Sequence, residues 1–526
     1  MKKTFLTIMP AALIALTSLV GCSKGLGSAD TDNLNVNIET RGVTISMWSP
    51  FGQIPSKALE ESIDEFQTLT GIKVEYETKG NYQPLNEAIK NATADGSYPN
   101  VALGYPDHFA GYINSNIQMR LDGLIKNDSK RKMTKKDAEG FDVADDGIRH
   151  LNYNDFYESY RRENETLEFK SNGEGYVLGL PFNKSTEVME CNAHFFDWVK
   201  TRDELKDKIY IPETWEQART VGAEVRTYLT PAFGKVLCSD GVVRDAAPED
   251  PTISVVLDLT GVTADTFRFI SYDSTDNFFI TLVRQFGGTY TEIDKTKTGV
   301  GYAAFNDEKY RATTLEVMDM IRDMADKKIL GIPETWDDSK GYCTNAFTSN
   351  RVLLNIGSSA GVGRSVANKV SRVTVKPIPQ KAGAETNYVI SQGTNLCLFN
   401  KGSEAEKVAA WKLMVYLSQQ ANGTFAYKAG YFPTGEIPKN SADYQDYLNN
   451  AYGAAEKANQ DAAIINSYTY TKSGWDRFTD PGFLGSSAIR AEVDFIIPNI
   501  FYSPDLKTNQ AILDKAYTVL ADYVRK

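Results

Sequence analysis

The chain has 526 residues, of which 42% are hydrophobic, enough to bury the cores of two or three domains. It carries 57 Lys and Arg against 68 Asp and Glu, giving a formal net charge of −11. An acidic body with scattered cations excludes nucleic acid as the expected partner, because binding a phosphate backbone requires a basic face.

The first residues have the pattern of a secretory signal peptide. Lys2 and Lys3 precede an apolar run from residue 5 to 20, and the segment Leu-Val-Gly-Cys ends at Cys22. This ending resembles the bacterial lipobox, in which the cysteine becomes the lipidated first residue. We therefore expect a signal peptide over residues 1–21, lipidation of Cys22 and a flexible tether over residues 22–40. No later stretch is long and apolar enough to span a bilayer, so the lipid would hold the protein outside the cytoplasmic membrane, on the extracellular face or in the periplasm.

Strands and helices alternate over the next 60 residues. Residues 43–48, 72–77 and 100–104 read as strands, and residues 55–70 and 82–94 read as amphipathic helices, the first of which stops at Gly71. This alternation predicts a parallel α/β sheet, whose ligands bind beyond the carboxyl ends of the strands. Trp48, Tyr82, Tyr105 and Asp107 lie at that edge.

Residues 178–196 are predicted to pass from one globular unit into another. The apolar run 176–181 suits a buried strand, and Pro181 marks an edge or exit because it cannot donate a ladder hydrogen bond. Asn183, Ser185 and Thr186 then place short polar side chains where the chain emerges. A ligand held between two units would contact such a crossing.

Two segments read as surface insertions, residues 127–175 and residues 231–266, and the second is expected to be irregular because it is rich in Gly, Pro and Asp. In the first, Asp142, Asp145 and Asp146 precede Gly147, but their spacing does not fit an EF-hand, so we interpret them as a solvated acidic loop. Elsewhere the pattern predicts further helices and strands. The helices are 276–286, 309–329, 404–417, 488–495 and 509–524, with another starting near Thr214, and the strands are 352–356, 373–377 and 393–399.

Four cysteines follow Cys22 without any C-x-x-C spacing, and the three histidines lie far apart, so we expect no metal and no cofactor. Two disulfides and buried free thiols both remain open for Cys191, Cys238, Cys343 and Cys397.

Residues 357–361, G-S-S-A-G, fit the G-x-S-x-G elbow of a serine hydrolase with Ser359 as nucleophile. None of the histidines, at positions 108, 150 and 194, lies in the late part of the chain where that fold places its base. We therefore favour binding over catalysis and expect no enzyme. The alternative is a lipid-anchored hydrolase of glycans or esters that uses Ser359 or carboxylates in a cleft.

Several segments occur in an order that resembles a known family. They are VTISMWSPFG from residue 43, KGNYQPLNEAI from 79, GLPFNKSTEVMECN from 179, FTSNRVLLNIGSSAG from 347, AGYFPT from 429 and SSAIRAEVDFI from 486. Together they resemble the extracellular solute-binding proteins of ABC importers, within the carbohydrate group that includes maltose-, multiple-sugar- and glycerol-3-phosphate-binding proteins.

This resemblance implies an α/β fold of the periplasmic-binding-protein type, with two lobes, three hinge crossings and a ligand cleft between the lobes. The crossings would lie near residues 186–190, 388–395 and 431–435. The N-terminal lobe would comprise residues 41–186 and 390–432, and the C-terminal lobe residues 187–389 and 433–526. It further implies a monomer that delivers a sugar to membrane permease subunits. A sensor or adhesin with the same fold is an alternative.

The resemblance also implies ligand positions at Tyr82, Asp107, Ser185, Ser358 or Ser359, Gly393 and Tyr431. Where the glycerol-3-phosphate-binding relatives carry a phosphate-holding arginine, this chain has Phe483 or its neighbours, which favours a neutral sugar. Sugars need aromatic faces and fixed polar groups. Tyr272 and Trp475 join the candidate aromatics, and Asn277 joins the candidate hydrogen-bonding groups. The complete predicted ligand-binding set is Trp48, Tyr82, Asp107, Asn183, Ser185, Asp276, Ser358, Ser359, Gly393 and Tyr431.

Overall fold

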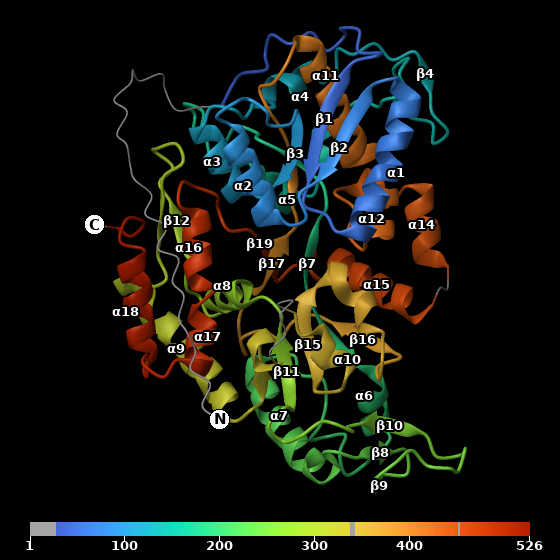
Figure 1. The fold of residues 1–526 in the computed structure, drawn as a ribbon, viewed down its shortest axis with the longest axis vertical. Coiled ribbons are helices and arrows are strands. Elements are labelled where there is room, and N and C mark those ends of the chain that lie inside the picture. Colours follow the sequence, from blue (N-terminus) through green and yellow to red (C-terminus); the bar gives the residue numbers. More distant parts are fainter. Residues whose placement is uncertain (1–27, 337–341, 451–452, 526) are drawn as a thin grey trace.

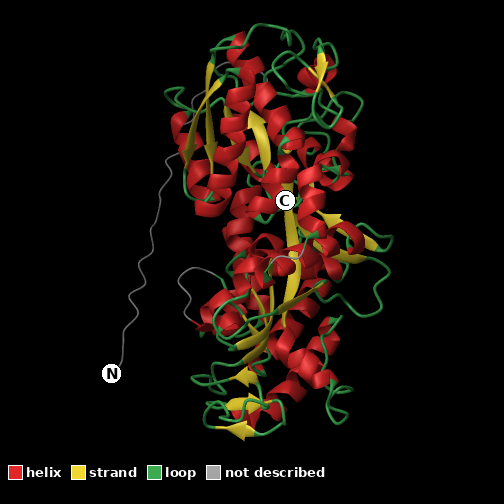
Figure 2. Ribbon diagram, turned by 90° about the vertical axis from the view of Figure 1, so that its right-hand side faces the viewer, coloured by secondary structure: helices red, strands yellow, loops and turns green. Residues whose placement is uncertain are grey.

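The computed structural model describes residues 28–336, 342–450 and 453–525 and has an elongated shape with two lobes (Figures 1 and 2). The predicted signal peptide and Cys22 lie outside the described residues. None of the helices in the described ranges combines the length and the apolar character needed to cross a bilayer.

The first lobe is built on a five-stranded sheet in the order β2-β1-β3-β18-β6. Strand β1 is parallel to β2 and β3, whereas β18 is antiparallel to β3 and β6. Its elements are β1 (Thr44–Ser49), α1 (Gln53–Thr70), β2 (Lys73–Thr78), α2 (Tyr82–Ala92), β3 (Val101–Gly104), α3 (Pro106–Asn114), α4 (Asp122–Asp128), β4 (Lys135–Lys136), β5 (Asp142–Val143), η1 (Tyr153–Asp155), α5 (Glu158–Arg162), η2 (Glu163–Glu165), β6 (Leu180–Pro181), β18 (Asn395–Leu398), α11 (Glu404–Val415), η6 (Tyr416–Gln420), α12 (Asn422–Ala429), α13 (Glu436–Lys439) and α14 (Ala442–Asn449).

The second lobe is built on a seven-stranded sheet in the order β14-β11-β15-β7-β17-β19, with β16 also paired to β7. Its elements are β7 (Ser185–Asn192), α6 (Ala193–Lys200), α7 (Trp215–Leu229), η3 (Thr230–Ala232), β8 (Val236–Cys238), β9 (Val243–Arg244), β10 (Val255–Asp258), β11 (Arg268–Tyr272), α8 (Thr275–Gln285), β12 (Thr291–Ile293), β13 (Gly301–Ala303), α9 (Glu308–Asp326), β14 (Leu330–Gly331), η4 (Pro333–Trp336), α10 (Thr344–Thr348), β15 (Val352–Ser358), η5 (Ser359–Ser365), β16 (Val373–Lys376), β17 (Asn387–Gln392), α15 (Ala454–Ile464), η7 (Ile465–Thr469), β19 (Trp475–Phe478), α16 (Ser486–Val493), α17 (Ile496–Tyr502) and α18 (Asn509–Val519).

Each lobe has its own hydrophobic core. The first core gathers apolar side chains from residues 36–182 and 396–429, and the second gathers them from residues 188–390 and 458–520. Local sequence signals explain many of these elements. Helix α1 buries Leu59, Ile63 and Phe66 on one face and ends at Gly71, and α7 begins with a capping box between Thr214 and Gln217.

The chain crosses between the lobes along neighbouring strands. It leaves the first sheet at β6 and enters the second sheet at β7, and it returns from β17 to β18 (Figure 1). Ser185 and Thr186 of β7 pair with the end of β17, so the two crossings run side by side. The third crossing was predicted near residues 431–435. That position is wrong, because α13 and α14 still pack against α12, whereas α15 packs against η5 and β16.

Residues 28–40 are not a free tether, which corrects that part of the expectation for residues 22–40. The backbone of Ala29 hydrogen-bonds with residues 118 and 120, and the fully buried Thr31 donates to the carbonyl of Arg120. Val36 contributes to the first core. This segment therefore belongs to the folded first lobe.

Both predicted insertions contain regular structure. Residues 231–266 contain a complete three-stranded antiparallel sheet, β10-β8-β9, where we expected irregular backbone. Residues 127–175 hold the short β4–β5 hairpin and the short helices η1, α5 and η2, and no group of potential metal ligands occurs in the described part of the chain. Asp146, which we interpreted as solvated, is instead ion-paired with Lys412 (2.8 Å).

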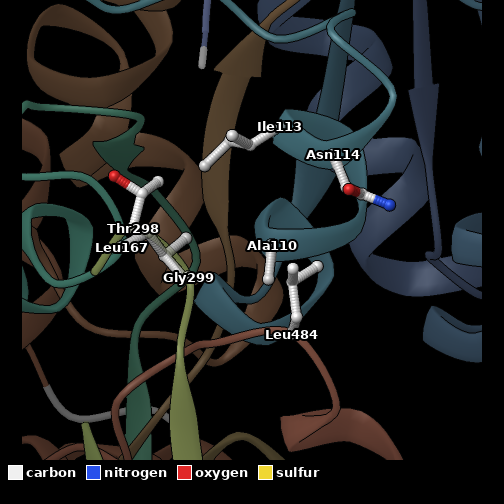
Figure 3. A pocket seen from close by; sticks show the side chains of 7 residues that line it. All are labelled: Ala110, Ile113, Asn114, Leu167, Thr298, Gly299 and Leu484. Atoms are coloured by element: carbon white, nitrogen blue, oxygen red, sulfur yellow. The ribbon is translucent and has the colours of Figure 1, made fainter. Parts of the chain in front are cut away.

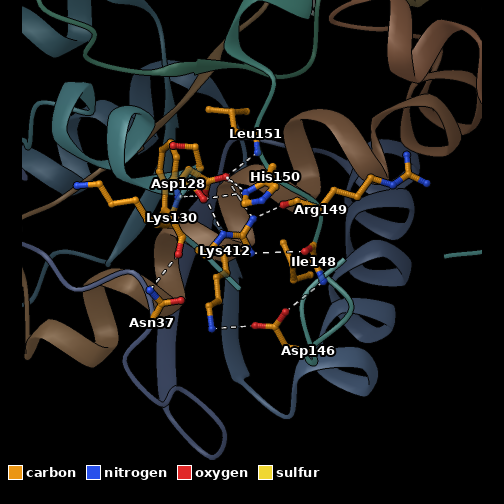
Figure 4. A network of polar contacts seen from close by, with 12 residues as sticks. Asn37, Asp128, Lys130, Asp146, Ile148, Arg149, His150, Leu151 and Lys412 are labelled. Carbon is orange, nitrogen blue, oxygen red and sulfur yellow. Dashed lines mark hydrogen bonds and ion pairs between the residues drawn. The ribbon is translucent and has the colours of Figure 1, made fainter. Parts of the chain in front are cut away.

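Asp128 ties the first insertion to the lobe (Figure 4). Its buried carboxylate accepts hydrogen bonds from Arg131 (2.9 Å), from the backbone of Leu151 (2.7 Å) and from the indole of Trp411 (2.8 Å), and it lies 3.4 Å from His150. Burial alone would raise the pKa of this carboxyl, but the contacts with His150 and Arg131 hold it below its ordinary value.

The four cysteines are buried, unpaired thiols, which answers the question that the sequence left open. Burial raises the pKa of the Cys191, Cys343 and Cys397 thiols, as expected for inert core residues.

Candidate ligand-binding site

Three tyrosines meet at the carboxyl end of the first sheet. Tyr82 begins α2 after β2, Tyr105 precedes α3 after β3, and Tyr431 follows α12. The rings of Tyr82 and Tyr105 are 5.1 Å apart, and Asn183 donates a 3.4 Å hydrogen bond from Nδ2 to the Tyr82 hydroxyl. Tyr431 is also a hydrogen-bond partner of Tyr82. We call these four residues the tyrosine cluster.

The first-lobe core supports this cluster. The ring of Tyr431 stacks on Phe425 (5.8 Å) and packs against Phe51 (6.0 Å), so it has little freedom to move. Asn183 Oδ1 accepts hydrogen bonds from the hydroxyl (2.5 Å) and the backbone (3.2 Å) of Thr394. Burial raises the pKa of all three tyrosines, so their hydroxyls stay neutral and can both donate and accept hydrogen bonds.

A charged cluster faces the first lobe from the second. Arg490 of α16 donates from Nε to Asp276 of α8 (2.6 Å), places Nη1 3.7 Å from Asp480 and hydrogen-bonds to Asn277. Asp107 of α3 accepts a 3.0 Å hydrogen bond from Ser487 of α16, which joins the two lobes directly. We call Asp107, Asp276, Asp480 and Arg490 the acidic cluster.

The pKa shifts follow from burial and from these contacts. Burial raises the pKa of Asp480 to about 7. Burial acts on Asp276 in the same direction, but the charge of Arg490 and a hydrogen bond from Ser274 bring its pKa below the ordinary value. The charges of Arg490 and Asp107 also act on the hydroxyl of Tyr105. The tyrosine and acidic clusters are therefore neighbours in one junction between the lobes.

Ser358 and Ser359, two predicted ligand residues of the second lobe, lie beside the tyrosine cluster, but their hydroxyls stabilise the fold. Gly430 lies against Ala360, the residue after Ser358 and Ser359. The half-buried Ser358 caps η5 by accepting from the backbone of Ala360 (3.3 Å), whereas the buried Ser359 accepts from the backbone of Thr186 (3.2 Å).

The remaining predicted ligand residues lie partly at the junction between the lobes and partly in the hydrophobic core. Ser185 is 3% exposed, and Trp48 lies under the ammonium of Lys79 at 3.9 Å. Tyr272 is buried and hydrogen-bonded to Glu187, and Trp475 packs on Tyr470 at 4.7 Å. The structure thus brings Tyr82, Asn183, Tyr431, Asp107 and Asp276 together and leaves Tyr272 and Trp475 in packing roles.

Sequence reasoning missed Arg490 and Asp480. It assigned the arginine position of related proteins to Phe483, which is a core residue with 1% exposure. Arg490 reaches the junction seven residues later because α16 packs against both α8 and α3. The SSAIRAEVDFI segment contains this arginine, but its spacing did not indicate which residues it would meet.

Gly393 lies where β17 passes into β18, and it has a structural role. It has a φ of +96°, and a Cβ atom there would lie 1.9 Å from the carbonyl oxygen of Asn183. We expect Gly393→Ala to lower the free energy of unfolding by more than about 2 kcal/mol, measured by urea denaturation. Gly383→Ala is the matched control, because Gly383 also has positive φ (+71°) but open space around it. Equal losses in the two variants would refute this account.

Two cavities lie away from the predicted residues. One has about 10 Å³, room for a single water, between α3 and the 298–299 loop (Figure 3). The other has about 220 Å³ and lies between the first insertion and η6, lined by Phe141, Asp142, Arg149, His150, Asn152, Gln419 and Ile437. We assign the site to the junction because the hydroxyl, amide and charged groups of both lobes converge there.

The fold is a two-lobed α/β architecture like that of solved maltose-binding proteins, and polar and aromatic groups gather where its lobes meet. Residues 61–452 match the model of the bacterial extracellular solute-binding proteins, and the chain belongs to that family. No curated protein sequence matches it.

Solved structures with low sequence identity share the fold. UgpB from Mycobacterium tuberculosis, in complex with glycerophosphocholine, is 16% identical with a TM-score of 0.63, and the match covers 91% of this chain and 98% of UgpB. The GacH receptor of Streptomyces glaucescens, solved with acarbose, is 14% identical with a TM-score of 0.60, over 91% and 99% of the two chains. Lmo0181 from Listeria monocytogenes, in complex with cycloalternan, is 15% identical with a TM-score of 0.60, over 91% and 98%.

Proposed function

We propose that this protein captures a carbohydrate outside the cytoplasm and delivers it to the permease of an ABC importer. It acts as a monomer without a cofactor, anchored outside the cytoplasmic membrane by lipid on Cys22. Its N-terminal lobe comprises residues 28–186 and 390–450, which include α13 and α14, and its C-terminal lobe comprises residues 187–389 and 453–525. Family membership supports the transport role.

The observation that carries the carbohydrate assignment is the tyrosine cluster. Aromatic rings pack against the C–H faces of a sugar, while neutral hydroxyls and an amide exchange hydrogen bonds with its hydroxyl groups. Tyr82, Tyr105 and Tyr431 supply rings and hydroxyls together, and Asn183 supplies the amide. The acarbose and cycloalternan complexes of structurally similar proteins support the same ligand class.

The mechanism follows from the placement of the site between two lobes. A ligand that contacts Tyr82 and Tyr431 on one lobe and Asp276 on the other makes all these contacts only when the lobes are together. The ligand therefore stabilises the closed form over the open form by the difference between its binding free energies for the two forms. The closed form is the one that a permease would recognise.

The geometry around Ser359 favours binding over hydrolysis. Its hydroxyl is buried and accepts from the backbone of Thr186, whereas the ring of His108 on α3 packs against Tyr105 (5.6 Å). His194 contacts Ser371 and His150 contacts Asp128. A serine nucleophile needs a base within hydrogen-bond reach, and in the described part of the chain no histidine is hydrogen-bonded to Ser359.

The test is thermal unfolding of residues 28–526 against neutral sugars, amino sugars, sugar phosphates and polyols. A ligand at 100 times its Kd should add about 2.7 kcal/mol of stability and raise the Tm. We expect a shift with a saccharide that is recovered intact. A cleaved saccharide would contradict the binding role, and a panel without any shift would contradict the carbohydrate assignment.

A further inference from the structure

Three carboxyl groups of the acidic cluster face a single guanidinium, and Asp480, whose pKa burial raises to about 7, is half-ionised near neutral pH. Asp276 binds Arg490 at 2.6 Å, Asp480 lies 3.7 Å from the same guanidinium, and Asp107 approaches from the first lobe. Arg490 also hydrogen-bonds to Asn277. Its donors are thus directed at the protein's own acceptors, and the cluster carries an excess of carboxylates.

Neighbouring groups do not remove this excess. Arg284 acts on Asp480 from a distance but is directed towards Asp476, 4.0 Å away. Asp494 accepts a hydrogen bond from Thr275. Glu187 contacts Tyr272, and burial raises its pKa to about 8, so it stays protonated near neutral pH. These residues add no free positive charge to the junction.

Two buried polar atoms, one in the acidic cluster and one beside it, have no hydrogen-bond partner. They are Oδ2 of Asp480 and the hydroxyl of Tyr290, whose side chain is 6% exposed. The charges of Asp480, Arg490, Asp276 and Asp107 all act on the Tyr290 hydroxyl, which places it among them. A buried polar group without a partner costs free energy that a ligand donor would recover.

We propose that the ligand is an amino sugar, or an oligosaccharide with a protonated amine, whose ammonium group binds at Asp480, Tyr290 and Asp107. An ammonium has three donors and a positive charge, which match two carboxylates and an unpaired hydroxyl. The sugar ring would lie against the tyrosine cluster. A sugar phosphate would meet three carboxylates and an arginine that is already paired. This inference rests on the proposed carbohydrate-binding function and specifies its ligand class.

The experiment compares matched sugars by isothermal titration near neutral pH. The pairs are glucose with glucosamine, and cellobiose with its 2,2′-diamino counterpart, with glucose 6-phosphate as the anionic probe. We expect each amine to bind at least about tenfold more tightly than its neutral partner, and the phosphate to bind weakest. Tighter or equal binding of the neutral sugars would overturn the amine assignment and leave the carbohydrate role standing. A failure of every saccharide to bind would overturn both.

Two variants locate the preference within the cluster. Asp480→Asn should reduce the ratio of amine to neutral affinity about tenfold or more while the neutral sugar still binds. If Asp480→Asn fails to fold, Asp107→Asn takes its place. Asp107 is half-buried on α3, and its replacement should lower the same ratio of amine to neutral affinity. An unchanged ratio in a folded variant would overturn the assignment of the ammonium to that carboxylate cluster.

Discussion

Replacement of Tyr82 by alanine is expected to weaken ligand binding at least about thirtyfold, with little loss of stability. Truncation of a central aromatic side chain in a binding site typically costs about 2 kcal/mol or more. Tyr82 contacts Tyr105 through its ring and Asn183 through its hydroxyl, yet its own side chain is only half-buried. Isothermal titration with the saccharide found in the thermal panel measures the loss.

Tyr98→Ala is the matched control for this loss. Tyr98 is also a half-buried tyrosine of the first lobe, with its ring against Phe399 (5.7 Å) and its hydroxyl on the carbonyl of Asn400 (3.1 Å). Tyr98 precedes β3, whereas Tyr82 follows β2 and Tyr105 follows β3, so the control lies at the amino end of the strands whose carboxyl ends carry the cluster. Tyr82→Phe keeps the ring and loses the hydroxyl, so it separates the contributions of these two groups to ligand affinity. Equal affinities for Tyr82→Ala and Tyr98→Ala would show that the ligand binds elsewhere.

The elements that could be predicted from sequence are those whose signals are local. The apolar spacing of α1, its stop at Gly71 and the cap of α7 at Thr214 each lie within one helix length. The tyrosine cluster could be approached in the same way, because Tyr82 and Tyr105 follow directly after strands of a parallel sheet. The sequence places Tyr105 at this edge of the sheet, but the predicted ligand-binding set does not include it.

The features that escaped prediction depend on contacts between distant segments. The hydrogen bond from Ser487 to Asp107 joins residues 380 positions apart, and the one from Arg490 to Asn277 joins residues 213 positions apart. Residues 28–40 are held by backbone hydrogen bonds of Ala29 to residues 118 and 120 and by the side chains of Thr31 and Val36, and none of these contacts produces a hydrophobic period in the sequence. The three-stranded sheet β10-β8-β9 arises in a stretch whose Gly, Pro and Asp content suggested loops.

Strand β7 shows a further limit of pattern reading. Its sequence STEVMECN includes two glutamates, which usually indicate an exposed face, yet all eight residues are buried. Glu187 and Glu190 are tolerated there because each has hydrogen-bond donors beside it. Ser365 and Asn355 donate to Glu190 at 2.6 Å and 3.1 Å. These partners come from other elements, Asn355 from β15 and Ser365 from η5, so the sequence of β7 alone could not reveal that its carboxyls face inward.

Glu190 should make the stability of the second lobe depend on pH. Burial raises the pKa of its carboxyl from 4.5 to about 8. Below the lower value the carboxyl is protonated in the folded and unfolded states alike, so its contribution to stability is fully present. Between the two values only the unfolded chain ionises, and stability falls with rising pH by up to about 1.4 kcal/mol per pH unit until the folded carboxyl also ionises.

Glu190→Gln is therefore expected to gain stability relative to the natural protein as pH rises from about 5 to 8, by an amount on the order of a few kcal/mol. Glutamine has nearly the same shape as protonated glutamate and cannot ionise, so the folded state no longer has to retain a proton that the unfolded chain releases. Urea denaturation across the pH range measures the difference, and Glu224→Gln, an exposed position on α7, is the control. The control should follow the natural protein at every pH. If Glu190→Gln did so as well, the buried carboxyl would not be the source of the pH dependence, and Glu187, whose pKa burial also raises to about 8, would be the next residue to replace.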